Sequence, residues 1–447
     1  MSGVVGIYSK EINHVSQYLY YGLYGLQHRG QVSTGIAVNN NGFVDYFKDM
    51  GLVHEVFPKE VMDRLRGNIA IGQVRYAFSD EGKSIRNVEP LVVGYRRGAL
   101  ALGHDGSIVN FSSLRDQLED KGSIFQSDLD AELIANLIAK HHQDDVEEAV
   151  KKALSDVIGS YGLVIMTNDR LIGARDPLGI KPLSLGKLKD SYVIASETCA
   201  FDTMGAEFIR DVKPGEILVI DSKGVRTIGE SKEERKLCLF ELIYFARPDS
   251  RIDGKSIYLA RIEAGRILAK EAPVEADIVI GAPDSGIVAA IGYAEESKTP
   301  YAEGIIKNRY VGRTFIQPTE ELREQGVRIK LNALKENIQG KKIVLVDDSI
   351  IRGTTIIRTV SMLRDAGAKE IHVRISSPPV TNSCHLGMDT PNEDNLLAHS
   401  MTIEEMRDSI GADSLAYISL EGLLEAVGNT NGFCRGCLTG QYPIEKQ

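Results

Sequence analysis

The chain has 447 residues, of which 43% are hydrophobic and 26% are charged, and its formal net charge is -10. This composition is typical of a globular protein with two or three domains, and the acidic balance argues against nucleic-acid binding. No apolar run reaches the length of a membrane span and the first residues lack the pattern of a signal peptide, so we expect a cytoplasmic protein without a membrane partner.

The chain begins MSGVVGIYSK, which places Ser2 directly before a short apolar run. A nucleophile next to the initiator methionine is typical of enzymes in which the exposed α-amino group is the base for the neighbouring side chain. Serine is a weaker nucleophile than cysteine because its hydroxyl ionises less readily. Met-Ser-Gly is also an ordinary way to begin a protein, so this stretch alone leaves both interpretations open.

Short β-branched runs separated by glycine and charged turns continue to about residue 230. Their spacing predicts a sheet-rich layered domain over 1–230, with amphipathic stretches such as 130–154 as helices. The charged stretch GESKEERK at 229–236 predicts a connector. A second domain is expected over 231–447.

Helices and strands alternate in the second domain. The predicted elements are a helix at 255–271, the strand ADIVIGAP, a helix at 286–297, the strand KKIVLVDDS, a helix at 355–367 and the strand EIHVRISSP. Such alternation predicts an α/β domain with a parallel sheet and crossover helices.

The most specific motif is KKIVLVDDSIIRGTTI at 341–356, in which an apolar strand ends in Asp347 and Asp348 and a polar loop then opens a helix. At the carboxyl end of a parallel strand, backbone N–H groups and the helix dipole suit a phosphate monoester. The adjacent carboxylates suit ribose hydroxyls, so the motif predicts a site for a ribose 5-phosphate. The alternative is a solvated strand end with a capping aspartate.

Five cysteines in a cytosolic chain do not indicate disulfides. We expect Cys199 in the core. Cys434 and Cys437 form a C-x-x-C pair, while Cys238 and Cys384 stand alone upstream. Four thiolates can close a zinc site or an iron-sulfur cluster, and the spacing separates neither from a chance pair with two core cysteines.

Over nearly its whole length the sequence resembles the glutamine phosphoribosylpyrophosphate amidotransferase family. The stretches that carry the resemblance are YGLYGLQHRGQ (21–31), GARDPLGIKPL (173–183), FELIYFARPDS (240–250), APDSG (282–286) and KNRYVGRTFIQPT (307–319), together with the motif at 341–356. The resemblance implies an α+β N-terminal-nucleophile domain, an αββα sandwich, followed by an α/β phosphoribosyltransferase domain. It also implies a pentosyltransferase that makes 5-phosphoribosylamine and pyrophosphate for purine biosynthesis, and a homodimer or homotetramer.

The resemblance assigns roles in the phosphoribosylpyrophosphate site. Asp347 and Asp348 would bind ribose and, with Ser285, a Mg²⁺ ion carried by the pyrophosphate. A basic loop that closes on the pyrophosphate would include Lys307, Arg309, Tyr310 and Arg313, unless these side chains are simply solvated. The 5-phosphate cradle would be Ser349, Arg352, Gly353, Thr354 and Thr355.

The resemblance also implies that Cys238, Cys384, Cys434 and Cys437 hold a structural 4Fe-4S cluster, with zinc as the alternative. Such a cluster would tie the domain junction to the C-terminal tail. We expect it to support stability rather than redox catalysis.

The N-terminal half departs from the family pattern. Ser2 stands where active members carry a cysteine nucleophile, and His104-Asp105-Gly106 replaces a HNG triplet whose asparagine belongs to the oxyanion hole. A carboxylate there would repel the developing charge and forfeit about 3–4 kcal/mol or more. Val32 replaces the glutamate that follows the HRGQ motif, and 78–80 replaces a threonine-rich turn.

Other residues of the glutamine pocket are retained. Arg75 matches the arginine that holds the glutamine carboxylate, and Asp130 matches the acid that takes its ammonium, although the register also allows Asp128. Glutamine binding is therefore expected to survive where its hydrolysis does not.

The leading hypothesis is an amidophosphoribosyltransferase with an intact synthase half that takes ammonia, either free or delivered by a partner. The alternatives are a transferase for another amine acceptor, a regulatory paralogue that binds phosphoribosylpyrophosphate or purine nucleotides, and an ordinary glutamine-dependent enzyme in which Ser2 was engineered. Purine nucleotides are candidate inhibitors of the enzyme in the leading hypothesis, and the sequence does not decide whether they inhibit it.

Overall fold

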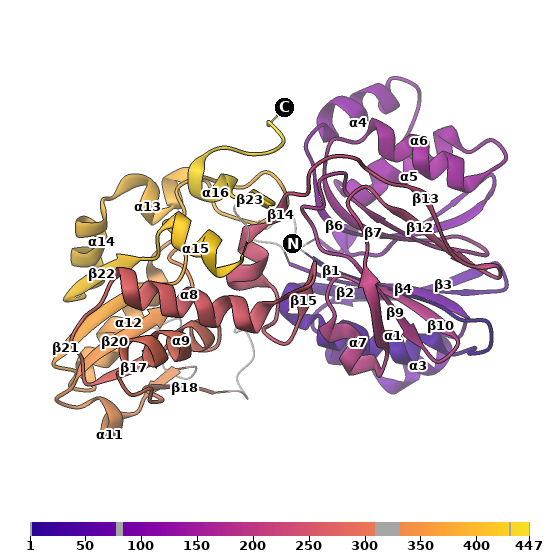
Figure 1. Ribbon diagram of the computed structural model, residues 1–447. Coiled ribbons are helices and arrows are strands. Elements are labelled where there is room, and N and C mark those ends of the chain that lie inside the picture. The colour runs from indigo at the N-terminus through magenta and orange to yellow at the C-terminus, as the bar shows by residue number, and fades with distance from the viewer. Residues whose placement is uncertain (1, 77–83, 309–330, 429–430, 447) are drawn as a thin grey trace.

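The computed structural model describes residues 2–76, 84–308, 331–428 and 431–446. Figure 1 shows two halves side by side, the N-terminal half from indigo to magenta and the C-terminal half from red to yellow. Within the described ranges, every helix is too short or too polar to cross a membrane.

The N-terminal half contains two antiparallel sheets. The first comprises β1 (Ser2–Tyr8), β2 (Ser33–Asn40), β3 (Phe43–Met50), β4 (Ile69–Arg75), β9 (Ser184–Leu188), β10 (Ser191–Ala195) and β11 (Glu207–Asp211). The second comprises β5 (Leu91–Tyr95), β6 (Gly98–Ile108), β7 (Gly159–Met166), β8 (Leu171–Arg175), β12 (Ile217–Asp221) and β13 (Gly224–Gly229). Their strand orders are β11-β9-β10-β1-β4-β2-β3 and β13-β12-β8-β7-β6-β5.

Helices cover the outer face of each sheet. Those on the first sheet are α1 (Val15–Gly25), α2 (Val53–Val56), α3 (Lys59–Arg64) and α7 (Cys199–Met204). Those on the second are α4 (Phe111–Glu119), α5 (Asp130–His141) and α6 (Val146–Asp156). A third apolar cluster fills the space between the sheets, because side chains alternate between the two faces of each strand. The αββα sandwich expected for this half is confirmed.

The C-terminal half is built on a parallel sheet in the order β17-β20-β21-β22. Its strands are β17 (Ile278–Gly281), β20 (Lys342–Asp347), β21 (Glu370–Ile375) and β22 (Ser414–Tyr417). The helices on one face are α8 (Ile257–Glu271), α9 (Ile287–Ser297) and α15 (Leu420–Ala426), and those on the other are α12 (Thr354–Asp365) and α14 (Ile403–Ile410). The predicted parallel α/β domain is confirmed.

Short elements complete this half. They are a π-helical turn (Glu241–Phe245), α11 (Lys335–Ile338), α13 (Leu397–Ser400), α16 (Gly436–Thr439), and the strand pairs β14 (Leu237–Cys238) with β23 (Phe433–Cys434), β15 (Arg251–Ile252) with β16 (Lys255–Ser256), and β18 (Ile305–Lys307) with β19 (Leu331–Ala333). Through β14 and β23, the segment that enters this half pairs with the C-terminal tail.

Candidate functional site

Two neighbouring strands of the parallel sheet, β17 and β20, end beside a cavity of about 450 Å³. The loop 282–286 follows β17 and contributes Ser285 to the lining. At Gly286 a Cβ atom would stand 2.4 Å from the Val346 carbonyl oxygen, so only glycine lets this loop approach β20 so closely. The cavity therefore lies where open parallel sheets bind their ligands.

Two adjacent carboxyl groups lie at the end of β20. Asp348 is 5% exposed and accepts hydrogen bonds from the hydroxyls of Ser285 and Ser349. Asp347 Oδ1 accepts a hydrogen bond from the Asp348 N–H at 2.9 Å. Burial, together with the neighbouring carboxylate, raises the pKa of Asp347 well above its usual range, and burial raises the pKa of Asp348. Hydroxyl donors or a divalent cation would relieve this cost.

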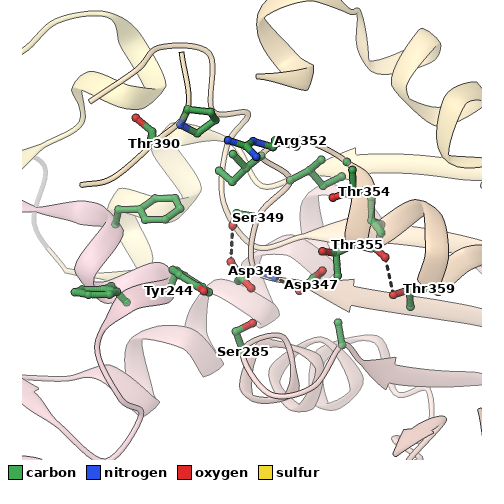
Figure 2. Close-up of a pocket in the computed structure, with 18 of the residues that line it drawn as sticks. Tyr244, Ser285, Asp347, Asp348, Ser349, Arg352, Thr354, Thr355, Thr359 and Thr390 are labelled. Carbon is green, nitrogen blue, oxygen red and sulfur yellow. Dashed lines mark hydrogen bonds between the residues drawn. The ribbon is translucent and has the colours of Figure 1, made fainter. Parts of the chain in front are cut away.

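The loop that follows these carboxylates leads into the N-terminus of α12 (Figure 2). Gly353 caps the helix with φ +76°, and a Cβ there would stand 2.9 Å from the Leu397 side chain. Ser349, Arg352, Thr354 and Thr355 line the cavity, and the labelled side chains surround one space. A turn of backbone N–H groups at a helix N-terminus fits a phosphate group.

The rest of the cavity wall comes from segments far apart in the sequence. His28 and Tyr76 belong to the N-terminal half, and Tyr244 belongs to the π-helical turn. Thr390 lies on the long loop that follows β21, and its hydroxyl accepts a hydrogen bond from the Cys384 N–H at 2.7 Å. Residue pattern alone did not identify these four positions, although His28 and Tyr244 fall in the stretches that carry the family resemblance.

The basic loop is only partly covered by the described residues. Lys307 ends β18 and forms an ion pair with Asp284, which precedes Ser285. Arg309, Tyr310 and Arg313 lie outside the described residues. The structure therefore places the first of the four predicted residues beside the cavity loop and gives no position for the others.

Ser2 begins β1, opposite Arg75 of β4, and is 4% exposed. Its N–H donates to Asp105 Oδ1 at 2.8 Å, and its carbonyl oxygen accepts from Arg29 Nε at 2.9 Å. Asp105 lies on β6 of the other sheet, next to Gly106, where a Cβ would stand 2.0 Å from the Ser160 carbonyl oxygen. Val32 is buried, and its N–H donates to the Arg75 carbonyl. Residues 78–80 lie outside the described ranges.

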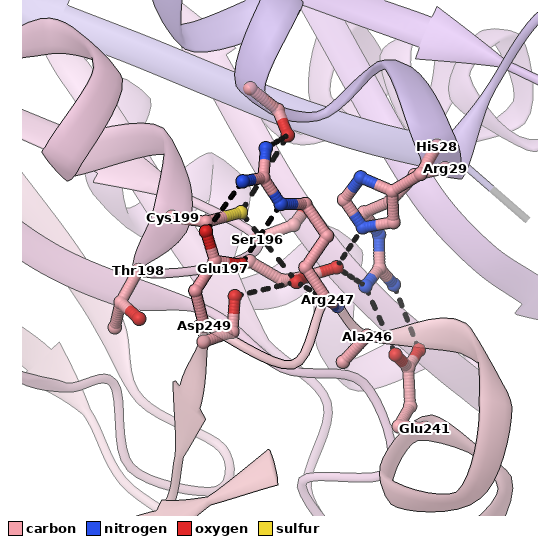
Figure 3. Close-up of polar contacts among 12 residues, drawn as sticks. His28, Arg29, Ser196, Glu197, Thr198, Cys199, Glu241, Ala246, Arg247 and Asp249 are labelled. Atoms are coloured by element: carbon pink, nitrogen blue, oxygen red, sulfur yellow. Dashed lines mark hydrogen bonds and ion pairs between the residues drawn. The ribbon is translucent and has the colours of Figure 1, made fainter. Parts of the chain in front are cut away.

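Arg29 is completely buried and contacts three carboxylates, and Figure 3 shows two of them, Glu197 and Glu241. Nη1 donates to Glu197 at 2.5 Å, and Nη2 donates to Glu241 at 2.8 Å and to Asp105 at 3.0 Å. Burial alone would lower the pKa of Arg29, but these carboxylates raise it well above its usual range. Its guanidinium also lies 4.3 Å from the centre of the Phe245 ring. We call Arg29, Lys181, Asp105, Glu197 and Glu241 the buried ion network.

Lys181 is the second cation of the buried ion network. Its Nζ lies 3.7 Å from Asp105 Oδ1 and 3.9 Å from Glu241 Oε1, and it donates to the Gly387 carbonyl at 3.0 Å. Burial opposes the ionisation of Asp105, but Lys181 and Arg29 lower its pKa to about 2. Asp105 is therefore a carboxylate at neutral pH. Both oxygens of this carboxylate have partners, Oδ1 with the Ser2 N–H and Oδ2 with Arg29.

Glu197 joins the buried ion network to the second half. It accepts from His28 Nε2 at 2.7 Å, from the Arg247 N–H at 2.9 Å and from the Ser250 hydroxyl at 2.7 Å. Although burial opposes it, the contacts with His28 and Arg29 lower the pKa of Glu197 far below its usual range. His28 thus connects this network to the cavity that it lines.

A second group of charged side chains lies near Ser2. Arg75 donates to the Asn87 carbonyl, and its Nε lies 3.7 Å from Glu89 Oε2. Asp130, at the start of α5, lies 3.7 Å from His104 Nδ1 and accepts from the Ile108 N–H at 3.3 Å. Glu89 is 4% exposed and was not singled out from the sequence.

Asp130 and Asp128, the two candidates that the sequence left open for the acid of the glutamine pocket, differ in their surroundings. Asp130 lies in this group of charges, whereas the Asp128 side chain is 79% exposed and pairs with Arg115 at 2.9 Å. Burial raises the pKa of Glu89 and of Asp130 to about 7, and burial lowers the pKa of His104 to about 3. Asp130 is therefore the better candidate for a pocket acid.

The four cysteines named for a cluster come together from three segments. Cys238 and Cys434 are paired across β14 and β23, and Cys384 and Cys437 pack in the same apolar surroundings. Burial raises the pKa of Cys434 to about 12 and raises those of Cys238 and Cys437 as well. Across the described residues, these thiols and the other His, Cys, Asp and Glu side chains form no group of three or more placed to hold a metal ion. The four predicted ligands therefore share one apolar region, but their thiols are not placed to hold a metal ion in the described residues.

Cys199 is separate from these four. It begins α7, is completely buried and donates weakly to the Gly25 carbonyl at 3.6 Å. The core position predicted for it is confirmed.

Two family models match the chain: a glutamine amidotransferase domain over residues 79–203 and a phosphoribosyl transferase domain over residues 257–376. The amidophosphoribosyltransferase of Archaeoglobus fulgidus is 50% identical and covers 99% of this chain and 98% of its own. That of Bacillus subtilis is 48% identical and covers 99% of this chain and 94% of its own.

Solved structures match as closely. One, described as the allosteric regulatory enzyme of purine biosynthesis, superposes with a TM-score of 0.94 at 48% identity and covers 100% of this chain and 97% of its own. Another, the glutamine phosphoribosylpyrophosphate amidotransferase of Bacillus subtilis in complex with ADP and GMP, gives a TM-score of 0.93 at 48% identity and covers 100% and 98%.

Proposed function

The chain belongs to the amidophosphoribosyltransferase family, and we propose that it makes 5-phosphoribosylamine with ammonia rather than glutamine as the nitrogen donor. The observation that carries the proposal is the hydrogen bond of 2.8 Å from the Ser2 N–H to the carboxylate of Asp105. The relatives support a place in purine biosynthesis, since one of them is described as an enzyme of that pathway.

The cavity at the ends of β17 and β20 supports phosphoribosylpyrophosphate binding. In the proposed mechanism, Asp347 and Asp348 accept hydrogen bonds from the ribose hydroxyls, while the loop before α12 binds the 5-phosphate. Mg²⁺ fits the oxygen donors Ser285, Asp347 and Asp348, since it prefers few carboxylates and shares substrate phosphate oxygens, and it would neutralise the pyrophosphate. Tyr244 and residues of the N-terminal half form part of the wall of this cavity.

The proposed reaction exchanges one bond for another at C1. The nitrogen lone pair of ammonia attacks C1 as the bond from C1 to the pyrophosphate oxygen breaks, so pyrophosphate leaves with that electron pair and the configuration inverts. The new ammonium group then loses a proton to solvent. Neutral ammonia is already nucleophilic, so no general base is assigned.

Asp105 opposes glutamine hydrolysis in two ways. An N-terminal nucleophile needs a neutral α-amino group as its base, but a carboxylate 2.8 Å from the Ser2 nitrogen favours the protonated amine once Met1 is removed. A negative side chain beside the nucleophile also disfavours the oxyanion that forms during hydrolysis. Both effects add to the weaker nucleophilicity of serine.

The first test is pyrophosphate release from phosphoribosylpyrophosphate and Mg²⁺ by anaerobically purified protein. We expect turnover with ammonium at a pH that supplies free ammonia, and turnover with glutamine at least about a hundredfold slower, because the oxyanion hole alone contributes that much. Equal rates with both donors would overturn the proposal. No pyrophosphate release with ammonium, but release with a larger amine, would favour a transferase for another amine acceptor. Binding of phosphoribosylpyrophosphate without any turnover would favour the regulatory paralogue.

Two variants test whether Ser2 alone or Ser2 together with Asp105 causes the expected slow turnover with glutamine. We expect Ser2→Cys alone to gain no glutaminase activity, because Asp105 remains ionised, whereas Ser2→Cys combined with Asp105→Asn gains measurable glutamate release. Glutamate formation by the single variant equal to that of the double variant would exclude Asp105 as an obstacle.

We further propose that the four neighbouring cysteines hold a structural 4Fe-4S cluster. The support for the cluster is that four thiols from separate segments share one apolar environment and that Fe–S clusters are held by cysteine thiolates. The raised pKa of Cys434 means that iron binding must displace protons from neutral thiols. Cys238, Cys384, Cys434 and Cys437 would hold the cluster, which would fasten the C-terminal tail to β14.

Metal analysis of the anaerobic protein tests this proposal without an activity assay. We expect about four irons per chain and a visible absorption band, both lost in Cys434→Ser and both kept in Cys199→Ser, whose thiol lies outside the four. One zinc ion per chain without iron would establish the zinc alternative, and iron retained by Cys434→Ser would remove that residue from the ligand set.

Purine nucleotides and self-association complete the proposal. The Bacillus subtilis relative is described in complex with ADP and GMP, which supports inhibition of this enzyme by purine nucleotides. A homodimer or homotetramer is proposed from the family resemblance.

A further inference from the structure

Arg261 is a buried cation to which the proposed reaction assigns no role. It lies on α8 and is 4% exposed, and its partners Leu242 and Ala246 belong to the apolar core of the C-terminal half. Among the residues that the structure describes, its hydrogen bonds go to carbonyl groups and not to a carboxylate. An arginine keeps its charge in proteins, and a buried charge without an ion pair costs free energy. The presence of this cation in the core therefore needs another explanation.

The guanidinium of Arg261 is bound to both parts of the π-helical turn Glu241–Phe245. Its Nε donates to the carbonyl of Leu242, inside the turn, at 2.9 Å. Its Nη2 donates to the carbonyl of Ala246, which ends the turn with extended backbone, at 2.7 Å. Carbonyl groups at the end of a helical turn lack helical partners, and the planar fork of an arginine can satisfy two of them at once. Arg261 therefore fixes the turn relative to α8.

The same turn forms part of the wall of the cavity at the ends of β17 and β20. Phe240, Tyr244 and Phe245 line this cavity, and Figure 2 includes Tyr244 among the side chains around it. Arg261 is not part of the lining. The shape of this part of the wall thus depends on a side chain that lies behind it.

The charge of Arg261 acts on the acids on either side of the turn. Burial lowers the pKa of Arg261, whereas Asp348 and Glu197 raise it. In the opposite direction, burial raises the pKa of Asp348, and Arg261 is among the groups that lower it. The cation therefore favours the ionised form of a carboxyl group that lines the cavity.

We propose that Arg261 is a positioning residue for phosphoribosylpyrophosphate binding, because its two hydrogen bonds hold the π-helical turn where Tyr244 and Phe245 form the cavity wall. This role rests on the proposed function, since it assumes that the cavity binds phosphoribosylpyrophosphate. Arg261 takes no part in the bond exchange at C1. Loss of its two hydrogen bonds would weaken the contact of the wall with substrate and transition state alike, so binding is affected more than the chemical step.

The experiment compares Arg261→Met with Arg266→Met in the full-length protein. Both variants remove an arginine from α8, but the Arg266 side chain is 41% exposed and pairs with Glu263 and Glu295. Pyrophosphate release with ammonium is measured over a range of phosphoribosylpyrophosphate concentrations. We expect Arg261→Met to raise KM about tenfold and to change kcat less than about threefold, and Arg266→Met to change neither. A merely structural role would reduce the folded fraction, and so the apparent kcat, without raising KM.

Amide hydrogen exchange provides a measurement without substrate. The Ala246 N–H donates to the Glu241 carbonyl at 2.9 Å, and the Arg247 N–H donates to Glu197. We expect both amides to exchange faster in Arg261→Met than in Arg266→Met, because the turn has lost its attachment to α8. Equal exchange in the two variants would show that Arg261 does not hold the turn, whatever the activity.

The kinetic outcomes separate this role from the proposed function. A wild-type protein that neither binds phosphoribosylpyrophosphate nor releases pyrophosphate would overturn the proposed function, and this role with it. An active wild-type protein with the same KM in Arg261→Met as in Arg266→Met would overturn only the role of Arg261. If Arg261→Met does not fold, Arg261→Lys replaces it: lysine keeps the charge but lacks the planar fork, so we expect KM to rise about threefold. An unchanged KM in Arg261→Lys would overturn the positioning role.

Discussion

Asp348→Asn is expected to lower ammonia-dependent pyrophosphate release about a thousandfold while the protein stays folded. The substitution keeps the size and one acceptor oxygen, so the hydroxyls of Ser285 and Ser349 retain a partner. It removes the negative charge that would hold the ribose and the cation. Pyrophosphate release over a range of phosphoribosylpyrophosphate concentrations measures the loss, and thermal unfolding measures stability.

The stability of this variant adds a second criterion. Asp347 and Asp348 are buried side by side and each has a raised pKa, so their ionised forms are costly in the folded state. Neutralising one of them is expected to leave the melting temperature equal or higher at neutral pH. Asp365→Asn, an exposed position at the end of α12, is the matched control and should change neither property. A loss of activity no larger than in the control would remove Asp348 from the site.

Arg29→Met is expected to destabilise the protein by about 3–5 kcal/mol, because it removes the cation from a completely buried set of carboxylates. Asp105, Glu197 and Glu241 would then face one another with Lys181 as the main remaining cation. Chemical unfolding, with the two halves monitored separately where their transitions differ, measures the loss. Arg115→Met removes an arginine whose ion pairs are at the surface, and is expected to cost less than about 1 kcal/mol.

A double variant keeps this prediction testable if Arg29→Met does not fold. Adding Glu241→Gln removes one of the uncompensated charges, so the double variant is expected to be more stable than Arg29→Met alone. If Arg29→Met were no more harmful than Arg115→Met, the buried ion network would not hold the two halves together.

The cavity at the ends of β17 and β20 could largely be predicted because its main parts are contiguous in the sequence. The strand that ends at Asp347 and the helix that starts at Thr354 were both expected, and the loop between them lines the cavity. Strand, turn and helix signals in one short segment reflect local physical preferences, which is why the motif could be interpreted before the fold was known.

The buried ion network could not be predicted in the same way. Arg29 lies 168 residues from Glu197 and 212 residues from Glu241, and each stands in a different sequence stretch. Their charges alone suggest solvent-exposed positions, since such residues are rarely buried without a partner. Glu89 was missed for a related reason: a single glutamate before a proline has no local signal, and only its burial next to Arg75 makes it notable.

The contacts between the halves have a consequence for how this chain can evolve. The hydroxyl of Ser160 donates to the Leu386 carbonyl at 2.8 Å, Lys181 donates to the Gly387 carbonyl, and His28 forms part of the cavity wall. Under the proposed use of ammonia, the chain has no need of glutamine hydrolysis. Deleting the N-terminal half would nevertheless open the cavity at the ends of β17 and β20 and remove Arg29 from Glu241. The proposal thus implies that mutations can accumulate around Ser2 while selection for the C-terminal half alone preserves the N-terminal half.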